Sequence, residues 1–237
     1  METGQSTARG EWIALGQEGA RRFRAYLARP DAGRGPGLVI LHDMFGANAV
    51  FQSLADAQAS RGRCCLMPNI FWRSENDGVL PYEGSHEPAR RRIEALDFGA
   101  AAAGLEAPID WLRRSPLTNG KVVVIGFCFS GNLAFLAAAR TDVDAAVSLY
   151  ALGISRFVAE AGRVRCPLQL HYGMLDTQVP LSEVDAVAKG VAGNPAIELF
   201  RYDDAGHSFF NPVRPTYNKA ASAVAEQRIE ALIARFA

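Results

Sequence analysis

The sequence lacks the features that direct a protein to membranes or to nucleic acids. Its 25 Lys and Arg residues are balanced by 25 Asp and Glu residues, so no net charge attracts a polyanion. No stretch approaches about eighteen consecutive apolar residues, the length that predicts a membrane span. The N-terminal METGQSTARGEW has no apolar core of the kind found in signal peptides. We therefore expect a cytoplasmic protein that binds neither membrane nor nucleic acid.

Cysteine is scarce, with four residues in a chain of 237. Cys64 and Cys65 are adjacent within an apolar run, Cys128 and Cys166 are isolated, and the sequence contains no CxxC pair. This spacing argues against a zinc site and against a framework of disulfides. Reduced, mostly buried thiols are therefore expected, and no metal site is predicted.

What the sequence does contain is a regular alternation of short apolar runs with longer helical patterns. Hydrophobic residues make up 49% of the chain, enough for the core of a single domain spanning residues 1–237. Runs such as VVVIG and LVIL are apolar throughout, as strands are in a sheet covered on both faces. The alternation predicts an α/β fold with a doubly wound, mostly parallel sheet and helices on both faces.

The predicted elements follow this alternation along the chain. Strands are expected at residues 37–42, 64–67, 121–126, 144–150, 168–172 and 198–202. One or two polar-faced strands at a sheet edge are expected within residues 12–28. Helices are expected at residues 49–60, 132–140, 182–191 and 218–236, with one long helix within 91–114. In such sheets, ligands bind beyond the carboxyl ends of the strands.

The hexapeptide GFCFSG follows one of these strands and holds two nucleophiles, Cys128 and Ser130. A sharp turn from strand to helix presents one side chain above the sheet, and the residues two positions before and after it must be small. With Cys128 at the tip, Gly126 and Ser130 meet this requirement. With Ser130 at the tip, Cys128 and Asn132 do not. The alternative is that Cys128 is a small buried side chain at a strand end.

A nucleophilic Cys needs a base and a group that orients the base. His207 lies in DDAGHSFF after a predicted strand, and Asp176 lies in YGMLDTQVP after another. The order nucleophile, acid, histidine is the order that α/β-hydrolases use. Asp176 could instead be a turn former before Pro180. Of the other histidines, His171 is expected within a strand.

Four motifs together resemble the dienelactone hydrolase family, a branch of the α/β-hydrolases. They are HDMFGAN at 42–48, GFCFSG at 126–131, YGMLDTQVP at 172–180 and AGHSFFNP at 205–212. The resemblance implies a catalytic triad of Cys128, His207 and Asp176. It also implies an oxyanion hole formed by the backbone N–H groups of Phe129 and Met44.

The sequence departs from the family pattern at the substrate site. Asp43 stands where the family usually has a Glu that holds the resting thiol until substrate arrives, so Asp43 is a candidate for gating the thiol. The resemblance also implies two arginines that bind a substrate carboxylate. Arg90, Arg91 or Arg92 could supply the first. At the second, the chain has Asn211, with Arg214 three residues further on.

These residues predict a hydrolase of activated esters or lactones that works through a thioester on Cys128 and needs no cofactor. The resemblance favours hydrolysis of a dienelactone to maleylacetate, with a small-molecule lactone or ester as the partner. A carboxylesterase or thioesterase with another acyl substrate is the alternative, and a non-catalytic binding protein on the same fold is a further one. A monomer and a dimer are both compatible with the sequence.

Overall fold

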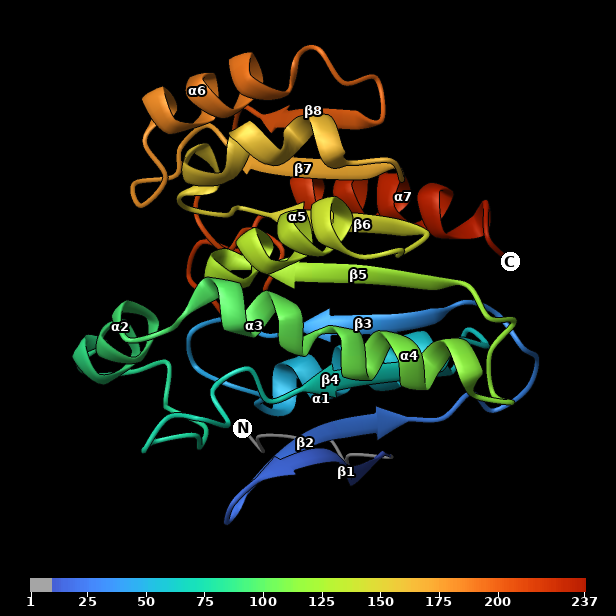
Figure 1. Ribbon diagram of the computed structural model, residues 1–237. Coiled ribbons are helices and arrows are strands. Elements are labelled where there is room, and N and C mark those ends of the chain that lie inside the picture. Colours follow the sequence, from blue (N-terminus) through green and yellow to red (C-terminus); the bar gives the residue numbers. More distant parts are fainter. Residues whose placement is uncertain (1–9) are drawn as a thin grey trace.

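The computed structural model describes residues 10–237, which contain one sheet of eight strands in the order β1-β2-β4-β3-β5-β6-β7-β8 (Figure 1). Strand β2 pairs antiparallel with both of its neighbours, β1 and β4. All other neighbouring strands in the sheet pair parallel. The strands are β1 Glu11–Glu18, β2 Arg21–Ala28, β3 Gly37–Leu41, β4 Cys65–Pro68, β5 Val122–Phe127, β6 Ala145–Leu149, β7 Leu168–Gly173 and β8 Ile197–Tyr202.

Each predicted strand is confirmed to within one or two residues at its ends. The segment predicted as one or two edge strands forms the hairpin of β1 and β2, of which β1 is the outermost and the more exposed. The central strands β3, β5, β6 and β7 are buried along their whole length, which is why their sequences are apolar without alternation.

The helices confirm the prediction with one exception. They are α1 Ala49–Ala59, α2 Glu87–Glu94, α3 Phe98–Gly104, α4 Glu106–Arg114, α5 Gly131–Arg140, α6 Leu181–Val191 and α7 Lys219–Ala234. A 3₁₀ segment at Ile154–Arg163 was not predicted.

The single long helix predicted within residues 91–114 is wrong, because this region forms α2, α3 and α4. Asp97 is extended and its side chain accepts the Ala100 N–H, so it begins a new helix. Pro108 has no N–H and is tolerated only within a first helical turn, so α4 has to begin close before it. An apolar pattern at helical spacing continues across both breaks, and that pattern suggested one helix.

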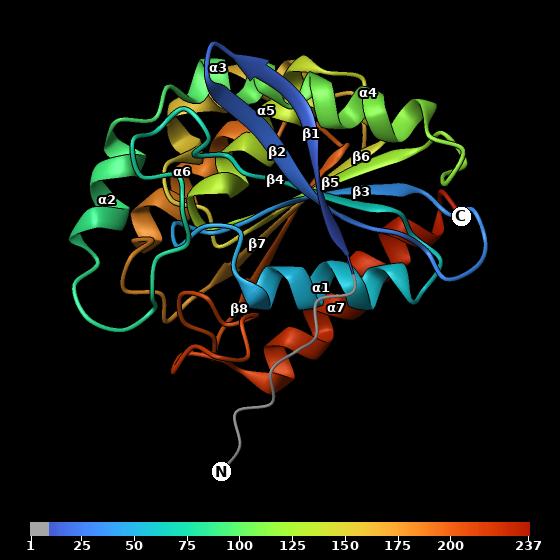
Figure 2. The same cartoon turned by 90° about the horizontal axis from the view of Figure 1, so that it is seen from below.

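The helices cover both faces of the sheet, as predicted. Helices α1 and α7 lie on one face, whereas α3, α4 and α5 lie on the other (Figures 1 and 2). The core is accordingly divided by the sheet into two apolar clusters. Phe51, Ile229 and Ile233 belong to the α1 and α7 side, and Leu112, Phe135 and Val187 belong to the other.

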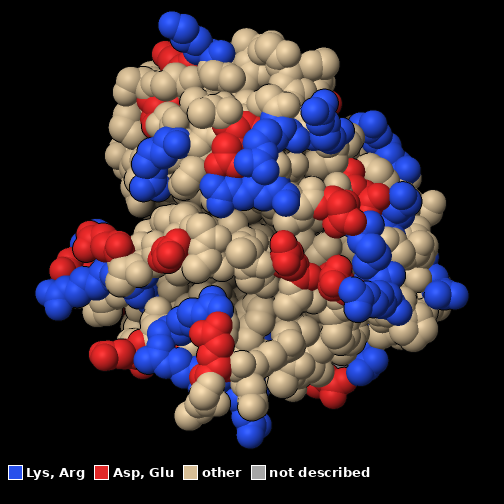
Figure 3. Space-filling model, in the orientation of Figure 1, with Lys and Arg blue, Asp and Glu red and all other residues tan. Residues whose placement is uncertain are grey.

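The parallel strands end at one edge of the sheet, on the left in Figure 1. The segments that follow β3, β5, β7 and β8 therefore meet there, and they carry the four motifs of the sequence. Over the face of the molecule seen in Figure 3, basic and acidic side chains are interspersed.

Candidate active site

Cys128 lies at the tip of a sharp turn between β5 and α5. Its φ is 57°, in the left-handed region that a side chain disfavours. A Cβ added at Gly126 would lie 2.3 Å from the Ser130 carbonyl oxygen, so only glycine fits there. The turn therefore needs the small residues that the sequence provides, and the strain lies at the residue that it presents.

Ser130 is buried in the base of this turn. Its Oγ accepts the Phe127 N–H at 2.9 Å and lies 2.8 Å from the Leu41 carbonyl oxygen, to which it donates. Its hydroxyl joins the ends of β5 and β3, and the residue has no exposed surface. Of the two nucleophiles in GFCFSG, only Cys128 is partly accessible.

The Cys128 sulfur, His207 and Asp176 form a continuous hydrogen-bonded chain. His207 Nε2 lies 3.3 Å from the Cys128 Sγ, and His207 Nδ1 lies 2.8 Å from Asp176 Oδ2. Burial lowers the pKa of His207, but the facing Cys128 sulfur and the Asp176 carboxylate outweigh burial and raise this pKa to about 10. The contacts with the sulfur and the carboxylate thus favour the charged form of the imidazole.

The Asp176 carboxylate is fixed by two backbone donors. Its Oδ1 accepts the N–H groups of Gln178 and Val179 at 2.7 and 2.9 Å, which leaves Oδ2 for His207. The same side chain therefore closes its own turn and contacts His207.

His207 is also constrained on its other sides. The Thr216 hydroxyl donates to its carbonyl oxygen, and the Tyr150 ring meets the imidazole edge to face at 5.2 Å between centroids. Tyr150 and Ser208 have φ values of 42° and 61°. Together with Cys128, they are the non-glycine residues with positive φ among residues 10–237, and all three lie at this site.

Residues 43–46, which we call the oxyanion loop, follow β3. The Met44 N–H makes no hydrogen bond within the described residues. The Phe129 N–H lies in the first turn after Cys128, where backbone donors have no partner within the helix. Both groups are thus available for an oxyanion, as the resemblance implies.

Asp43 is 5% exposed, and its carboxylate is engaged within this loop. Its Oδ1 accepts the Phe45 N–H at 2.8 Å and its Oδ2 accepts the Tyr82 hydroxyl at 3.2 Å. Burial raises the pKa of Asp43 to about 6, against the opposing effect of these donors and of Arg214. Within the described residues, its hydrogen bonds do not include the Cys128 thiol.

The three arginines of α2 have other partners. Arg90 and Arg91 are exposed and paired with Glu87, at 3.8 and 2.8 Å. Arg92 is 5% exposed and donates to the carbonyl oxygens of Met44 and Gly78. These three candidates are therefore held by partners within the protein.

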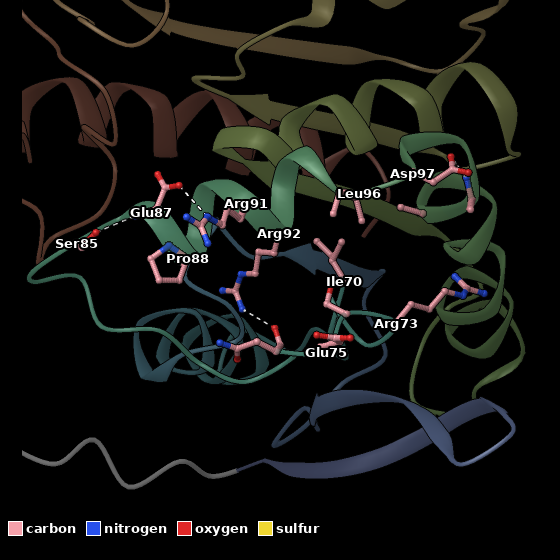
Figure 4. A pocket seen from close by; sticks show the side chains of 15 residues that line it. Ile70, Arg73, Glu75, Ser85, Glu87, Pro88, Arg91, Arg92, Leu96 and Asp97 are labelled. Carbon is pink, nitrogen blue, oxygen red and sulfur yellow. Dashed lines mark hydrogen bonds and ion pairs between the residues drawn. The ribbon is translucent and has the colours of Figure 1, made fainter.

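A cavity of about 840 Å³ lies between α2, the start of α3 and the segment after β4 (Figure 4). Arg91 and Arg92 line it, whereas Cys128 and His207 do not. Figure 4 shows the Arg92 guanidinium reaching from α2 toward the segment after β4. Arg92 thus lines the cavity and also donates a hydrogen bond to the oxyanion loop.

The remaining candidates, Asn211 and Arg214, lie on the segment after His207. The Asn211 amide donates to the Tyr82 hydroxyl at 3.1 Å. The Arg214 guanidinium stacks on the rings of Phe45 and Tyr82. Its Nε is buried without a hydrogen-bond partner. No ion pair involving Arg214 is present among the described residues.

Sequence reasoning missed Tyr82 and Tyr150. Tyr150 directly follows β6, and its position at the carboxyl end of a strand was a usable signal. Tyr82 lies in the segment between β4 and α2, which has no helix or strand pattern, so no signal pointed to it.

The other histidines have structural partners. His42 Nδ1 lies 2.8 Å from the Asp43 carbonyl oxygen, and its Nε2 accepts the Ile70 N–H. His171 lies within β7 and contacts the Tyr202 hydroxyl at 2.7 Å. In residues 10–237, no three His, Cys, Asp or Glu side chains are grouped as metal ligands. None of the helices in this range is long and apolar enough to cross a membrane.

Comparisons with known proteins show the family of this chain. The model of the dienelactone hydrolase family matches residues 23–237. A carboxymethylenebutenolidase from Pseudomonas putida is 31% identical over 220 residues, which cover 92% of this chain and 93% of the relative. Carboxymethylenebutenolidase 1 from Cupriavidus pinatubonensis is 30% identical over 217 residues, which cover 90% of this chain and 92% of the relative. The dienelactone hydrolase structure from Anabaena variabilis has the same fold, with a TM-score of 0.69 and 17% identity. The match covers 96% of this chain and 98% of that structure.

Proposed function

Since the chain belongs to the dienelactone hydrolase family and is a hydrolase of ester or lactone bonds, we propose that it hydrolyses activated lactones and esters through a thioester on Cys128. The observation that carries this proposal is the hydrogen-bonded chain from the Cys128 sulfur through His207 to Asp176. Hydrolysis of a dienelactone to maleylacetate is the reaction we favour, because the curated relatives are named carboxymethylenebutenolidases.

In the proposed reaction, the Cys128 thiolate attacks the carbonyl carbon and forms the new C–S bond. The carbonyl oxygen becomes an oxyanion that accepts the N–H groups of Met44 and Phe129. Collapse breaks the C–O bond, and the leaving oxygen takes the proton of the His207 imidazolium. His207 then removes a proton from water, the resulting hydroxide attacks the thioester, and the thiolate departs.

A sulfur nucleophile favours substrates with a stabilised leaving group. The tetrahedral intermediate expels its better leaving group, and a thiolate departs more readily than a simple alkoxide. An enol lactone departs as an enolate and an aryl ester as a phenolate, so both should react forward. We therefore expect turnover of enol lactones and aryl esters to exceed that of alkyl esters.

We propose Arg214 as the group that binds a substrate carboxylate. Arg90, Arg91 and Arg92 are held by Glu87 or by carbonyl oxygens, whereas the guanidinium of Arg214 has a buried Nε without a partner. The Arg214 guanidinium also stacks on Phe45 and Tyr82, the two residues that donate hydrogen bonds to Asp43, which supports a position beside the proposed oxyanion loop. A carboxylate is the complement that an unpaired guanidinium prefers.

A carboxylesterase or thioesterase with another acyl substrate would use the same groups. The comparison that separates it from a dienelactone hydrolase is the ratio of kcat/KM values for a dienelactone, an aryl ester and an acyl thioester. Both hypotheses assume one domain in a cytoplasmic protein, and the continuous eight-stranded sheet and the four free thiols of the described residues support this assumption.

The test is hydrolysis of cis- and trans-dienelactone, followed by ultraviolet absorbance, with the wild type and Cys128→Ala. We expect turnover by the wild type and a loss of at least about a thousandfold in the variant. Ser130→Ala is the control, because it removes the hydroxyl of the second candidate nucleophile in the turn and leaves the Cys128 thiol in place. Retention of activity in Cys128→Ala would overturn the proposed nucleophile, and preference for the thioester would redirect the substrate assignment.

A further inference from the structure

The oxyanion loop is held on one side by Arg92. The guanidinium donates to the Met44 carbonyl oxygen through Nε at 3.0 Å and through a terminal nitrogen at 2.5 Å. It also donates to the Gly78 carbonyl oxygen at 2.8 Å and stacks on Phe71. This buried cation therefore fixes the peptide that follows the Met44 N–H.

A second set of contacts holds the same loop through Tyr82. The Tyr82 hydroxyl accepts hydrogen bonds from the amides of Asn48 and Asn211 at 2.9 and 3.1 Å. It donates its own proton to Asp43 Oδ2 at 3.2 Å. Asp43 Oδ1 in turn accepts the Phe45 N–H.

The direction of each bond in this set is fixed by its surroundings. The Asn48 Oδ1 accepts the backbone N–H groups that begin α1, and the Asn211 Oδ1 accepts the Val213 N–H. Each amide therefore has only its NH₂ group to offer to Tyr82. With two donors on its oxygen, the Tyr82 hydroxyl has Asp43 as the acceptor for its proton.

Tyr82 thus connects three segments that meet at the site. Asp43 belongs to the oxyanion loop, Asn48 begins α1, and Asn211 lies four residues after His207. All three side chains are at least nine-tenths buried. The segment that carries Tyr82 is itself tied to the loop, because the Leu80 N–H donates to the Phe45 carbonyl oxygen at 2.8 Å.

We propose that Tyr82 is a positioning residue of the oxyanion hole, which orients the Asp43 carboxylate so that the loop presents the Met44 N–H to the developing oxyanion. This inference rests on the proposed function, in which Cys128 is the nucleophile and Met44 is an oxyanion donor. It assigns Asp43 to the loop, and it leaves the Cys128 thiol paired with His207 in the enzyme without substrate.

Two reactions of Cys128 separate this role from a role in the triad. Acylation by an ester passes through an oxyanion and requires the loop. Alkylation by iodoacetamide displaces iodide at a saturated carbon, so it uses the thiolate and His207 but no oxyanion hole. A residue that positions the loop should therefore affect acylation and leave alkylation unchanged.

The experiment compares Tyr82→Phe with the wild type in both reactions, using 4-nitrophenyl acetate for hydrolysis. Loss of a whole oxyanion donor costs about 10²–10³ in kcat, so a misplaced donor should cost about tenfold. We expect kcat to fall about tenfold, with KM and the rate of alkylation each within about twofold of the wild type. Asp43→Asn should have the same effect, and the double variant should be no slower than either single variant.

Tyr26→Phe is the matched control, because its buried hydroxyl also donates to a carboxylate, that of Asp56, but does not contact the oxyanion loop. It should lose comparable stability in thermal unfolding and keep its kcat. An equal fall of hydrolysis and alkylation in Tyr82→Phe would overturn the proposal, because Tyr82 would then act on the thiol. Unchanged hydrolysis would overturn it as well. Failure of the proposed function itself would appear separately, as hydrolysis retained by Cys128→Ala.

Discussion

Two sides of the active site meet over the Cys128 sulfur, and they are built differently. On one side, Asp176 and His207 follow β7 and β8 and reach the sulfur through a direct chain of hydrogen bonds. On the other side, the oxyanion loop follows β3 and is held by Arg92 and Tyr82, which come from α2 and the segment before it. The acid–base side contacts the Cys128 sulfur directly through His207. The oxyanion side is held in place by Arg92 and Tyr82, whose hydrogen bonds go to the loop and not to the sulfur.

This difference separates two tasks of the proposed chemistry. In the proposed reaction, the acid–base side would control the charge on the sulfur and the movement of protons, and the oxyanion side would act on the substrate oxygen alone. A reaction that needs only the thiolate should therefore report on the first side, and a reaction through a tetrahedral intermediate should report on both.

The largest effect is expected on the acid–base side, from His207→Ala. This change removes the base for water and the cation beside the sulfur, so hydrolysis should fall by at least about a thousandfold. Alkylation of Cys128 by iodoacetamide at neutral pH should slow as well, because the thiolate loses its charged partner. Stopped-flow alkylation and steady-state hydrolysis measure the two effects, and unchanged alkylation would contradict the role of His207.

A smaller effect on catalysis is expected from Arg214→Gln, because Arg214 stacks on Phe45 of the oxyanion loop and on Tyr82. The KM for a lactone that carries a carboxylate should rise about ten- to a hundredfold, because a charge-assisted contact is lost. The KM for the neutral 4-nitrophenyl acetate should stay within about twofold. Arg91→Gln is the matched control, since Arg91 is exposed and paired with Glu87. An equal rise of KM for both substrates would rule out recognition of the carboxylate by Arg214.

The smallest effect is a dependence on pH that only the oxyanion side should show. The pKa of Asp43 is raised by burial to about 6, so its carboxyl gains a proton as the pH falls below this value. A protonated carboxyl has to donate a hydrogen bond, but the Tyr82 oxygen already accepts two, from Asn48 and Asn211. The contact that orients the loop should therefore weaken in acid.

The ratio of the burst rate of 4-nitrophenol release, which reports acylation, to the alkylation rate isolates this dependence, because both reactions begin from the same Cys128–His207 pair. We expect the ratio to fall severalfold between about pH 7 and pH 5, and to be independent of pH in Asp43→Asn. A ratio that is constant in the wild type would show that protonation of Asp43 does not disturb the loop.

The same comparison explains how much could be predicted from the sequence. On the acid–base side, Cys128, Asp176 and His207 each lie within five residues of the end of a parallel strand that has a recognisable sequence pattern, so their meeting at one edge followed from the parallel sheet. The turn at Cys128 could also be anticipated, because the small size of Gly126 is visible in the sequence and only a glycine fits there.

The oxyanion side could be predicted only in part. The face on which Arg90, Arg91 and Arg92 lie depends on where their helix begins, and the breaks between α2, α3 and α4 were missed. The burial of Arg92 depends on carbonyl oxygens of residues 44 and 78, whose approach no local pattern encodes. Tyr82 lies in a segment without helix or strand pattern. Its partner Asn48 is 34 residues away along the chain, and its partner Asn211 is 129 residues away.

The most direct test of the account is to identify the atom that carries the acyl group during turnover. The enzyme is mixed with an excess of an aryl ester and quenched in acid within milliseconds, and its peptides are analysed by mass spectrometry. The account predicts an acyl group on the peptide containing GFCFSG, attached to Cys128 and removed by hydroxylamine at neutral pH as a thioester is. An acyl group on Ser130 or on another residue, or turnover with no acylated enzyme in the burst phase, would contradict it.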